Sequence, residues 1–487
     1  MMRFDFAQML QWIRDAESAA SAHPAVTVAN APAGVLALND VVTDSRAIKP
    51  GSVFVALRGE RFDAHDFLAD VAALGASAVV VERLVPGLAL PAIVVPDARA
   101  ALGQIAHGWR SIYSVPVIGV TGSNGKTTVK EMIVAILAAA FGEDGYLGTR
   151  GNFNNEIGVP LTLFRLAPSH RAAVIEMGMN HPGEIAVLSR IAAPTLGLVN
   201  NAQREHQEFM ASVEAVAREN GAVIRHLPPD GVAVFPSDDD FTALWREEAG
   251  ARRVLTFGLD DSADVGASYV SGAFGSTLSV HVKGIAVPAA RFTVELAAVG
   301  EHNVRNALAA IACALGAGIA VDAVVRGLQA FAPVNGRLQR KQAISGALVI
   351  DDTYNANPDS VRAAIDVLAT IAAPRVLVLG DMGEVGDQGP QFHREIGAYA
   401  RERGVERFYA LGELAREAVD AYQNTPGEGT AQAVHFADID ALNAAVTLAA
   451  PTGATVLVKG SRFMKMERVV QHLVNVESVT QLQQETH

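Results

Sequence analysis

The residues best suited to chemistry lie in one glycine-rich run, Thr121-Gly-Ser-Asn-Gly-Lys-Thr-Thr128. A short apolar run precedes it, and a helix-forming segment that ends near Phe141 follows it. A strand, a tight glycine turn and a helix N-terminus present backbone N–H groups and the positive end of the helix dipole to a phosphate. Lys126 would reach the outer phosphates, and the hydroxyl of Thr127 would hold Mg²⁺. The run therefore predicts a phosphate loop (P-loop) of the shortened Gly-x-x-Gly-Lys-Thr form; the alternative is a glycine-rich β–α turn with a solvated lysine.

Further polar residues follow strands that are predicted near this loop. Glu176 closes an apolar run that begins at Ala172, and a carboxylate there is costly unless it is paired or bound to a metal. We interpret Glu176 as a Mg²⁺ ligand close to Thr127, with a salt bridge as the alternative. The next strand ends in Asn200-Asn201, and His206 comes a few residues later, where it could reach the same edge of the sheet.

Two polar clusters have both a structural and a functional interpretation. Asn303 and Asn306 lie three residues apart at the start of an Ala-rich helix, so they share one face. Two amides on one helical face suit recognition of a nucleobase edge, but they also suit a capped helix start. Asp44-Ser45-Arg46 is either an ordinary capping turn or part of a binding site. Both interpretations stand for each cluster.

Strand and helix patterns must position these residues, and they divide the chain into three α/β domains. Residues 1–97 form a small N-terminal α/β domain, and residues 98–331 form a central P-loop domain with a mostly parallel sheet. An antiparallel flap is expected near residues 263–298, and residues 332–487 form a Rossmann-like C-terminal domain. Ligands of such sheets gather at the carboxyl ends of the strands. The predicted strands lie near residues 53–57, 78–81, 92–95, 115–120, 172–177, 196–200, 231–235, 347–351, 375–379, 407–410 and 454–458.

Composition argues against several classes of protein. The 487 residues are 50% hydrophobic, and at roughly 150 residues per domain this length suits three domains. A formal net charge of -13 argues against nucleic acid or an anionic membrane as a partner. The single cysteine, Cys313, allows no disulfide within the chain, and no apolar run approaches the roughly twenty residues of a membrane span. We therefore expect a soluble cytoplasmic protein without stable membrane insertion. A monomer is a separate expectation that composition does not decide.

Taken in order, these segments resemble the ATP-dependent Mur ligases, and the resemblance covers nearly the whole chain. Its marks are Thr121 to Thr128, Glu176-Met-Gly-Met179, Gly300-Glu-His-Asn-Val-Arg-Asn306, Gly336-Arg337 and Lys459-Gly-Ser-Arg462. Two more stretches are similar to the branch that adds D-alanyl-D-alanine: Gly151-Asn-Phe-Asn-Asn-Glu-Ile-Gly-Val-Pro160 and Asp351-Asp-Thr-Tyr-Asn-Ala-Asn-Pro358. The Asp-Asn-Pro-Arg signature of the diaminopimelate-adding sibling does not occur.

The resemblance implies an ATP-dependent amide ligase with Mg²⁺ as a cofactor. Its members phosphorylate the terminal carboxylate of a UDP-N-acetylmuramoyl tripeptide. The amine of D-alanyl-D-alanine then attacks the acyl phosphate, and phosphate leaves. In chain order, the three domains would bind the UDP end of the substrate, ATP and the incoming dipeptide.

The resemblance also carries roles over to individual residues. Those implied for ATP are Thr121, Gly122, Ser123, Asn124, Gly125, Lys126, Thr127, Thr128, Asn303, Asn306, Arg337 and Asp352. Those implied for the UDP-linked substrate and the dipeptide are Ser45, Arg46, Asn152, Asn154, Asn155, Tyr354, Asn355 and Asn357. Mg²⁺ would be held by Thr127, Glu176 and His206, and Lys126 and His206 would be the catalytic residues.

One departure from the family concerns a lysine. Many relatives carry it as a carbamate that helps to hold a second Mg²⁺. Here the corresponding segment reads Ala217-Arg-Glu-Asn-Gly221 and contains no lysine. Glu219 or Asn220 is the candidate replacement.

Other functions share part of this pattern. Another Mur-type ligase or a folylpolyglutamate-type ligase would use the same P-loop with a different acceptor. A nucleotide switch or scaffold would need the P-loop but no carboxylate acceptor. No Asn-Lys-x-Asp guanine motif occurs in the sequence, which disfavours a GTP switch.

Overall fold

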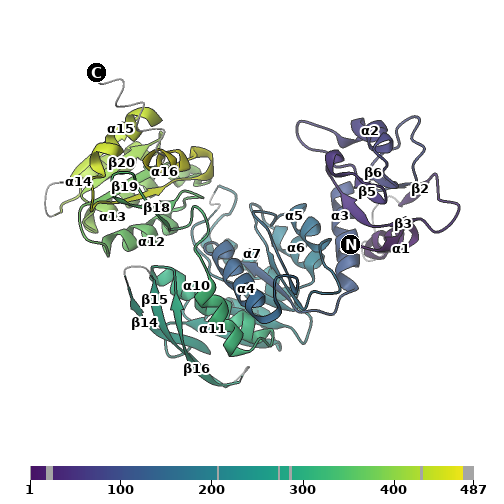
Figure 1. Ribbon diagram of the computed structural model, residues 1–487, viewed down its shortest axis with the longest axis horizontal. Coiled ribbons are helices and arrows are strands. Elements are labelled where there is room, and N and C mark those ends of the chain that lie inside the picture. Colours follow the sequence, from purple (N-terminus) through teal and green to yellow (C-terminus); the bar gives the residue numbers. More distant parts are fainter. Residues whose placement is uncertain are drawn as a thin grey trace.

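The computed structural model describes residues 2–17, 26–205, 208–272, 275–284, 288–427 and 431–474. Three α/β domains follow one another along the chain, as predicted, and each is built on its own sheet (Figure 1). The central domain lies between the other two (Figure 1). Among the described residues, no helix combines the length and the apolar character that crossing a membrane requires.

The N-terminal domain is a five-stranded sheet in the order β2-β7-β6-β5-β4, with a small β1-β3 pair beside it. Its elements are β1 (Phe4–Asp5), α1 (Phe6–Glu17), β2 (Thr27–Ala29), β3 (Ala37–Leu38), β4 (Asp40–Val42), β5 (Ser52–Val55), α2 (Leu68–Ala73), β6 (Ala78–Val81), β7 (Ala92–Val94) and α3 (Ala98–Ser111). Successive strand residues point to opposite faces, so Val53 packs with α1 and α3 while Phe54 packs with α2. Helix α3 also packs against α5 (Gly158–Leu163) and α6 (Glu184–Ala192) of the central domain and joins the two domains.

The central domain is a nine-stranded sheet in the order β16-β15-β14-β13-β12-β11-β8-β10-β9. Its strands are β8 (Val117–Thr121), β9 (Tyr146–Gly148), β10 (Ala172–Glu176), β11 (Leu196–Val199), β12 (Val232–Pro236), β13 (Arg253–Gly258), β14 (Val265–Ser271), β15 (Ser276–Val282) and β16 (Ala290–Leu296). Strands β8 to β14 pair in parallel, whereas β15 and β16 are antiparallel. The antiparallel segment expected near residues 263–298 is present as β14 to β16, and it extends this sheet because β14 pairs with β13.

Helices cover both faces of the central sheet. One face packs against α4 (Lys126–Phe141), α10 (Glu301–Gly316) and α11 (Val321–Ala330). The other packs against α5, α6, α7 (Val213–Asn220), α8 (Ala222–Arg225) and α9 (Thr242–Ala249). In the parallel register, Val120 of β8 pairs with Glu176 of β10, and Thr121 pairs with Val199 of β11. The carboxyl ends of three adjacent strands therefore meet where the P-loop begins.

The C-terminal domain is a six-stranded sheet in the order β17-β18-β22-β19-β20-β21. Its strands are β17 (Gln339–Gln342), β18 (Leu348–Asp352), β19 (Arg375–Gly380), β20 (Arg407–Leu411), β21 (Gln432–Phe436) and β22 (Thr455–Lys459), and only β17 is antiparallel. Helices α12 (Pro358–Ala369), α13 (Gly389–Glu402) and α14 (Ala415–Asn424) cover one face, and α15 (Ile439–Ala449) and α16 (Glu467–Val474) cover the other. The sequence patterns gave the four inner strands but neither edge strand.

Candidate active site

The P-loop lies between β8 and α4, and its shape depends on a glycine. Gly125 has a φ of 83°, in the left-handed region that favours glycine. A Cβ at this position would lie 2.4 Å from Oδ1 of Asn306 and 2.6 Å from Nδ2 of Asn200. Any side chain here would therefore push these two amides away from the loop. Helix α4 starts at Lys126, inside the glycine-rich run, and ends at Phe141 as predicted.

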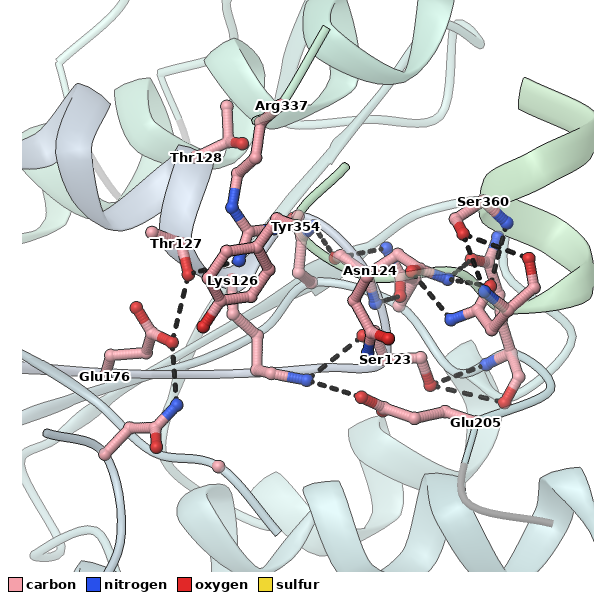
Figure 2. Close-up of a pocket in the computed structure, with 18 of the residues that line it drawn as sticks. Ser123, Asn124, Lys126, Thr127, Thr128, Glu176, Glu205, Arg337, Tyr354 and Ser360 are labelled. Atoms are coloured by element: carbon pink, nitrogen blue, oxygen red, sulfur yellow. Dashed lines mark hydrogen bonds and ion pairs between the residues drawn. The ribbon is translucent and has the colours of Figure 1, made fainter. Parts of the chain in front are cut away.

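A cavity of about 1420 Å³ opens in front of the P-loop, between the central and C-terminal domains. Most of the predicted site residues line it. They are Ser123, Asn124, Gly125, Lys126, Thr127, Thr128, Asn152, Asn154, Asn155, Glu176, Asn303, Asn306, Arg337, Asp352, Tyr354, Asn355 and Asn357. The structure thus brings segments from far apart in the sequence to one space (Figure 2).

Lys126 folds back over the P-loop. Its ammonium donates to the carbonyl oxygens of Gly122 and Ser123 at 2.5 and 3.0 Å. It also forms an ion pair with Oε1 of Glu205 at 2.8 Å, and both side chains are largely buried (Figure 2). Glu205 was not among the residues predicted from the sequence. Its place just beyond the carboxyl end of β11 is the signal that could have found it.

Thr127 and Glu176 form the part of the site that fits a divalent cation. The Thr127 hydroxyl donates to Oε1 of Glu176 at 3.1 Å, and the side-chain amide of Asn154 donates to the same oxygen at 2.9 Å. Glu176 is only 2% exposed, and its Oε2 has no hydrogen-bond partner among the described residues. A buried carboxylate oxygen without a donor is costly, and hard oxygen atoms are the ligands that Mg²⁺ prefers. The oxygen atoms of Thr127 and Glu176 therefore fit Mg²⁺ as ligands.

The two amides of α10 form a chain of hydrogen bonds beside the P-loop. Asn306 donates to Oδ1 of Asn303 at 3.2 Å, and it accepts from Nδ2 of Asn200 at 2.9 Å. Asn303 donates to the carbonyl of Val299 at 2.8 Å. Gly300 precedes the helix without a side-chain cap, so neither amide caps the helix start. Both amides line the cavity.

The C-terminal third of the chain closes the cavity from the other side. Arg337 donates from Nη2 to the Thr127 hydroxyl at 3.0 Å, and its guanidinium carbon lies 4.2 Å from the ring centroid of Tyr354 (Figure 2). Asp352 is held by an ion pair with Lys459 at 2.6 Å. Asn357 donates to Oδ1 of Asn124 in the P-loop at 2.9 Å. Two domains therefore touch the same loop.

Several predicted residues lie elsewhere. Thr121 and Gly122 do not line the cavity, and the Thr121 hydroxyl donates to Oδ1 of Asn220 at 2.6 Å. Ser45 and Arg46 lie in the N-terminal domain, where Asp44 caps a short 3-10 helix and pairs with Arg46 at 2.7 Å. Hydrogen bonding to Arg46 lowers the pKa of Asp44 to about 2. The capping turn is therefore present. His206 lies outside the described residues.

Glu219 does not present its carboxylate to the cavity. Its two oxygens accept backbone N–H groups from Gly183 and Ile185 at 2.9 and 2.8 Å, at the N-terminus of α6, where a negative charge is stabilised by the helix dipole. Asn220 is fully buried and is bonded to Thr121. Neither residue lines the cavity, so the candidate replacements for the missing lysine are used for packing and capping instead.

Three family models match the chain in order. Residues 38–110 match "Mur ligase family, catalytic domain", residues 120–314 match "Mur ligase middle domain", and residues 336–462 match "Mur ligase, glutamate ligase domain". The UDP-N-acetylmuramoyl-tripeptide--D-alanyl-D-alanine ligase of Escherichia coli strain K12 is 39% identical over 446 residues, which are 90% of this chain and 94% of the relative. The protein of that name from Bacillus subtilis strain 168 is 34% identical, over 92% of this chain and 96% of the relative.

Solved structures of MurF proteins are also similar to this chain. Crystal structure I of MurF from Acinetobacter baumannii is 34% identical with a TM-score of 0.86, over 97% of this chain and 99% of that one. The MurF ligase of Thermotoga maritima, solved in complex with ADP, is 26% identical with a TM-score of 0.78, over 89% and 97%. With three family models in order and high identity over nine-tenths of its length, this chain belongs to the Mur ligase family of ATP-dependent amide ligases.

Proposed function

We propose that this protein joins D-alanyl-D-alanine to the terminal carboxylate of a UDP-N-acetylmuramoyl tripeptide and converts ATP to ADP and phosphate. The similarity to ligases of that name supports the proposal. The observation that carries it is the hydrogen bond from Arg337 to Thr127, because it places a cation of the C-terminal third against the P-loop. A nucleotide switch would need the P-loop but not a second domain that completes the site.

We assign a binding role to each of the three domains. Residues 1–97 would bind the UDP end, with Ser45 and Arg46 in contact with it. Residues 98–331 would bind ATP and the tripeptide, and residues 332–487 would bind the dipeptide. Asn152, Asn154 and Asn155 line the central-domain side of the cavity and suit the tripeptide, whereas Tyr354, Asn355 and Asn357 line the C-terminal side and suit the dipeptide.

The first step would transfer the γ-phosphoryl group of ATP to the tripeptide. An oxygen of the tripeptide carboxylate attacks phosphorus, and the bond to ADP breaks. Lys126 would leave Glu205 and hold the phosphate oxygens, while Arg337 would add a second positive charge across the cavity. Glu176 and Thr127 would hold Mg²⁺, which when bound neutralises negative charge on the phosphates.

The second step would form the amide. The unprotonated amine of the dipeptide attacks the carbonyl carbon of the acyl phosphate and forms a tetrahedral intermediate. As this intermediate collapses, the bond breaks between that carbon and the oxygen that bridges it to phosphorus. Phosphate leaves with that oxygen, and the nitrogen gives up one proton. The protein's part is to hold amine and carbonyl close together and to keep water from the acyl phosphate.

Phosphate release from ATP tests the proposal. We expect rapid release only when both UDP-N-acetylmuramoyl tripeptide and D-alanyl-D-alanine are present, with a pentapeptide product detected by mass spectrometry. Release with folate and glutamate instead would assign the chain to the folylpolyglutamate-type ligases. Tight GTP binding without release would point to a nucleotide switch and contradict the proposal.

A further inference from the structure

The segment that follows β11 packs tightly against the P-loop. Its Asn201 accepts the backbone N–H of Asn124 at 2.8 Å, and the backbone N–H of Gln203 donates to the Ser123 hydroxyl at 2.9 Å. Glu205 of the same segment pairs with Lys126 at 2.8 Å. One side of residues 200–205 is therefore fixed to the loop that would hold the phosphates.

Arg204 lies between these residues but is directed toward the C-terminal domain. Its guanidinium binds both oxygens of Asp359 in the first turn of α12, with Nη2 2.7 Å from Oδ1 and Nε 3.1 Å from Oδ1 and 3.3 Å from Oδ2. Its backbone N–H donates to Oδ2 of Asp359 at 2.9 Å. Its Nη1 lies 2.7 Å from Oε2 of Glu395 on α13, and its guanidinium carbon lies 5.2 Å from the ring centroid of Phe392. One arginine thus contacts two helices of another domain.

This contact differs from an isolated ion pair on the protein surface in its burial and in its geometry. The three charged side chains are 25%, 23% and 33% exposed, so water screens them only in part. Arginine presents a planar fork that fits a carboxylate with two parallel hydrogen bonds. Burial works to lower the pKa of the Arg204 guanidinium, but its hydrogen bonds to Asp359 and Glu395 raise it above the ordinary value.

Other contacts cross the boundary at the same place. Asn357 and Asn124 exchange hydrogen bonds through their side-chain amides at 2.9 and 3.4 Å. The backbone N–H of Glu208 donates to the carbonyl of Glu384 at 3.3 Å. Each domain nevertheless has its own buried core, so these contacts set how the domains sit on one another rather than whether each of them folds.

We propose that Arg204 is a positioning residue that docks the C-terminal domain onto the P-loop, so that the dipeptide side of the cavity meets the phosphate side. The inference rests on the proposed function, because it assigns the dipeptide to the C-terminal domain. Arg204 does not touch the cavity itself. It acts through Asp359 and Glu395, and its neighbour Glu205 ties the same segment to Lys126.

The test separates docking from nucleotide binding. In Arg204→Ala we expect the KM for D-alanyl-D-alanine to rise by roughly tenfold or more, since a partly buried charge pair is lost. The Kd for ADP, measured by calorimetry, stays within about twofold, because no part of the P-loop is changed. The radius of gyration from small-angle X-ray scattering increases as the domains separate.

Two further variants make the result decisive. Arg204→Lys keeps the charge but not the fork, so its KM should lie between those of the wild type and Arg204→Ala. Asp359→Asn removes the partner charge from the other domain and should reproduce the loss if Arg204→Ala fails to fold. The matched control is Arg326→Ala, which removes an exposed pair with Asp322 inside α11 and should change nothing.

Two results would overturn the proposal. One is an unchanged dipeptide KM and an unchanged radius of gyration in Arg204→Ala; the other is a loss of ADP affinity as large as the loss for the dipeptide. A wild-type protein that does not ligate at all would refute the proposed function instead. The scattering comparison does not depend on ligation, so it would still decide whether Arg204 docks the domains.

Discussion

Replacing Arg337 with alanine is expected to lower kcat strongly while it lowers the free energy of unfolding only slightly. The guanidinium lines the cavity, donates to Thr127 and forms no ion pair with a carboxylate among the described residues, so its charge is available to a phosphoryl group. Removing one such donor from a transition state costs about 3–4 kcal/mol, so kcat should fall roughly 100- to 1000-fold. Arg337→Lys keeps the charge without the fork and should lie in between.

The cost to the fold is much smaller. Arg337→Ala removes a hydrogen bond to a neutral hydroxyl, worth about 1 kcal/mol, and a contact with the Tyr354 ring worth about 0.5–1 kcal/mol. A loss of about 2 kcal/mol leaves a domain of ordinary stability, about 5–15 kcal/mol, folded. The drop in kcat would therefore report on chemistry and not on unfolding.

The assay is phosphate release with all three substrates near saturation, with thermal unfolding followed in parallel. Arg340→Ala is the matched control, because Arg340 lies in β17, three residues away, and does not line the large cavity. Arg340→Ala should keep its kcat. A kcat for Arg337→Ala within about threefold of the wild type would refute the idea that the C-terminal domain completes the phosphate site.

The remaining predictions concern the metal, the P-loop and pH. Glu176→Gln keeps an acceptor for the Thr127 hydroxyl but loses the negative charge. The rate of ligation should therefore fall at least about 100-fold, and a titration should show that more Mg²⁺ is needed. An unchanged Mg²⁺ requirement would contradict the assignment of Glu176 as a Mg²⁺ ligand. Lys126→Ala should abolish phosphate release while circular dichroism stays native. Loss of the ion pair with Glu205 should lower the melting temperature. His393 is buried, accepts a backbone N–H and donates to a carbonyl, and burial lowers its pKa below the ordinary 6.5. The unfolded chain therefore binds the proton more readily, so the unfolding free energy should fall as pH drops below about 6.5, and His393→Gln should weaken this dependence in urea titrations.

Much of the P-loop side of the cavity could be predicted because its signals are local. A glycine in the left-handed region followed by Lys126 and a helix is a pattern of adjacent residues, and Glu176 stands out as a charge at the end of an apolar strand. Once the sheet is parallel, its register brings such strand ends together without further information. These predictions depended on periodicity and on one rule of topology.

The contacts between domains could not be predicted in the same way. Arg204 and Glu205 are adjacent in the sequence, yet one pairs with the C-terminal domain and the other with the P-loop. That division depends on how two separately folded domains approach each other, which no periodic pattern records. Likewise, the sequence offered Glu219 as a metal ligand, but its carboxylate is used at the N-terminus of α6, a competing demand that appears only in three dimensions.

Asn357 limits how this interface can change. Its side chain accepts the N–H of Ser360 to start α12, and the same amide gives a hydrogen bond to Asn124 of the P-loop. Aspartate, serine or threonine would start the helix about as well, but an aspartate could not offer an N–H, and a hydroxyl is too short to do both. Two requirements of different origin, one local and one between domains, thus fall on a single amide. We therefore expect fewer residue types to be accepted at position 357 than at an ordinary helix N-cap.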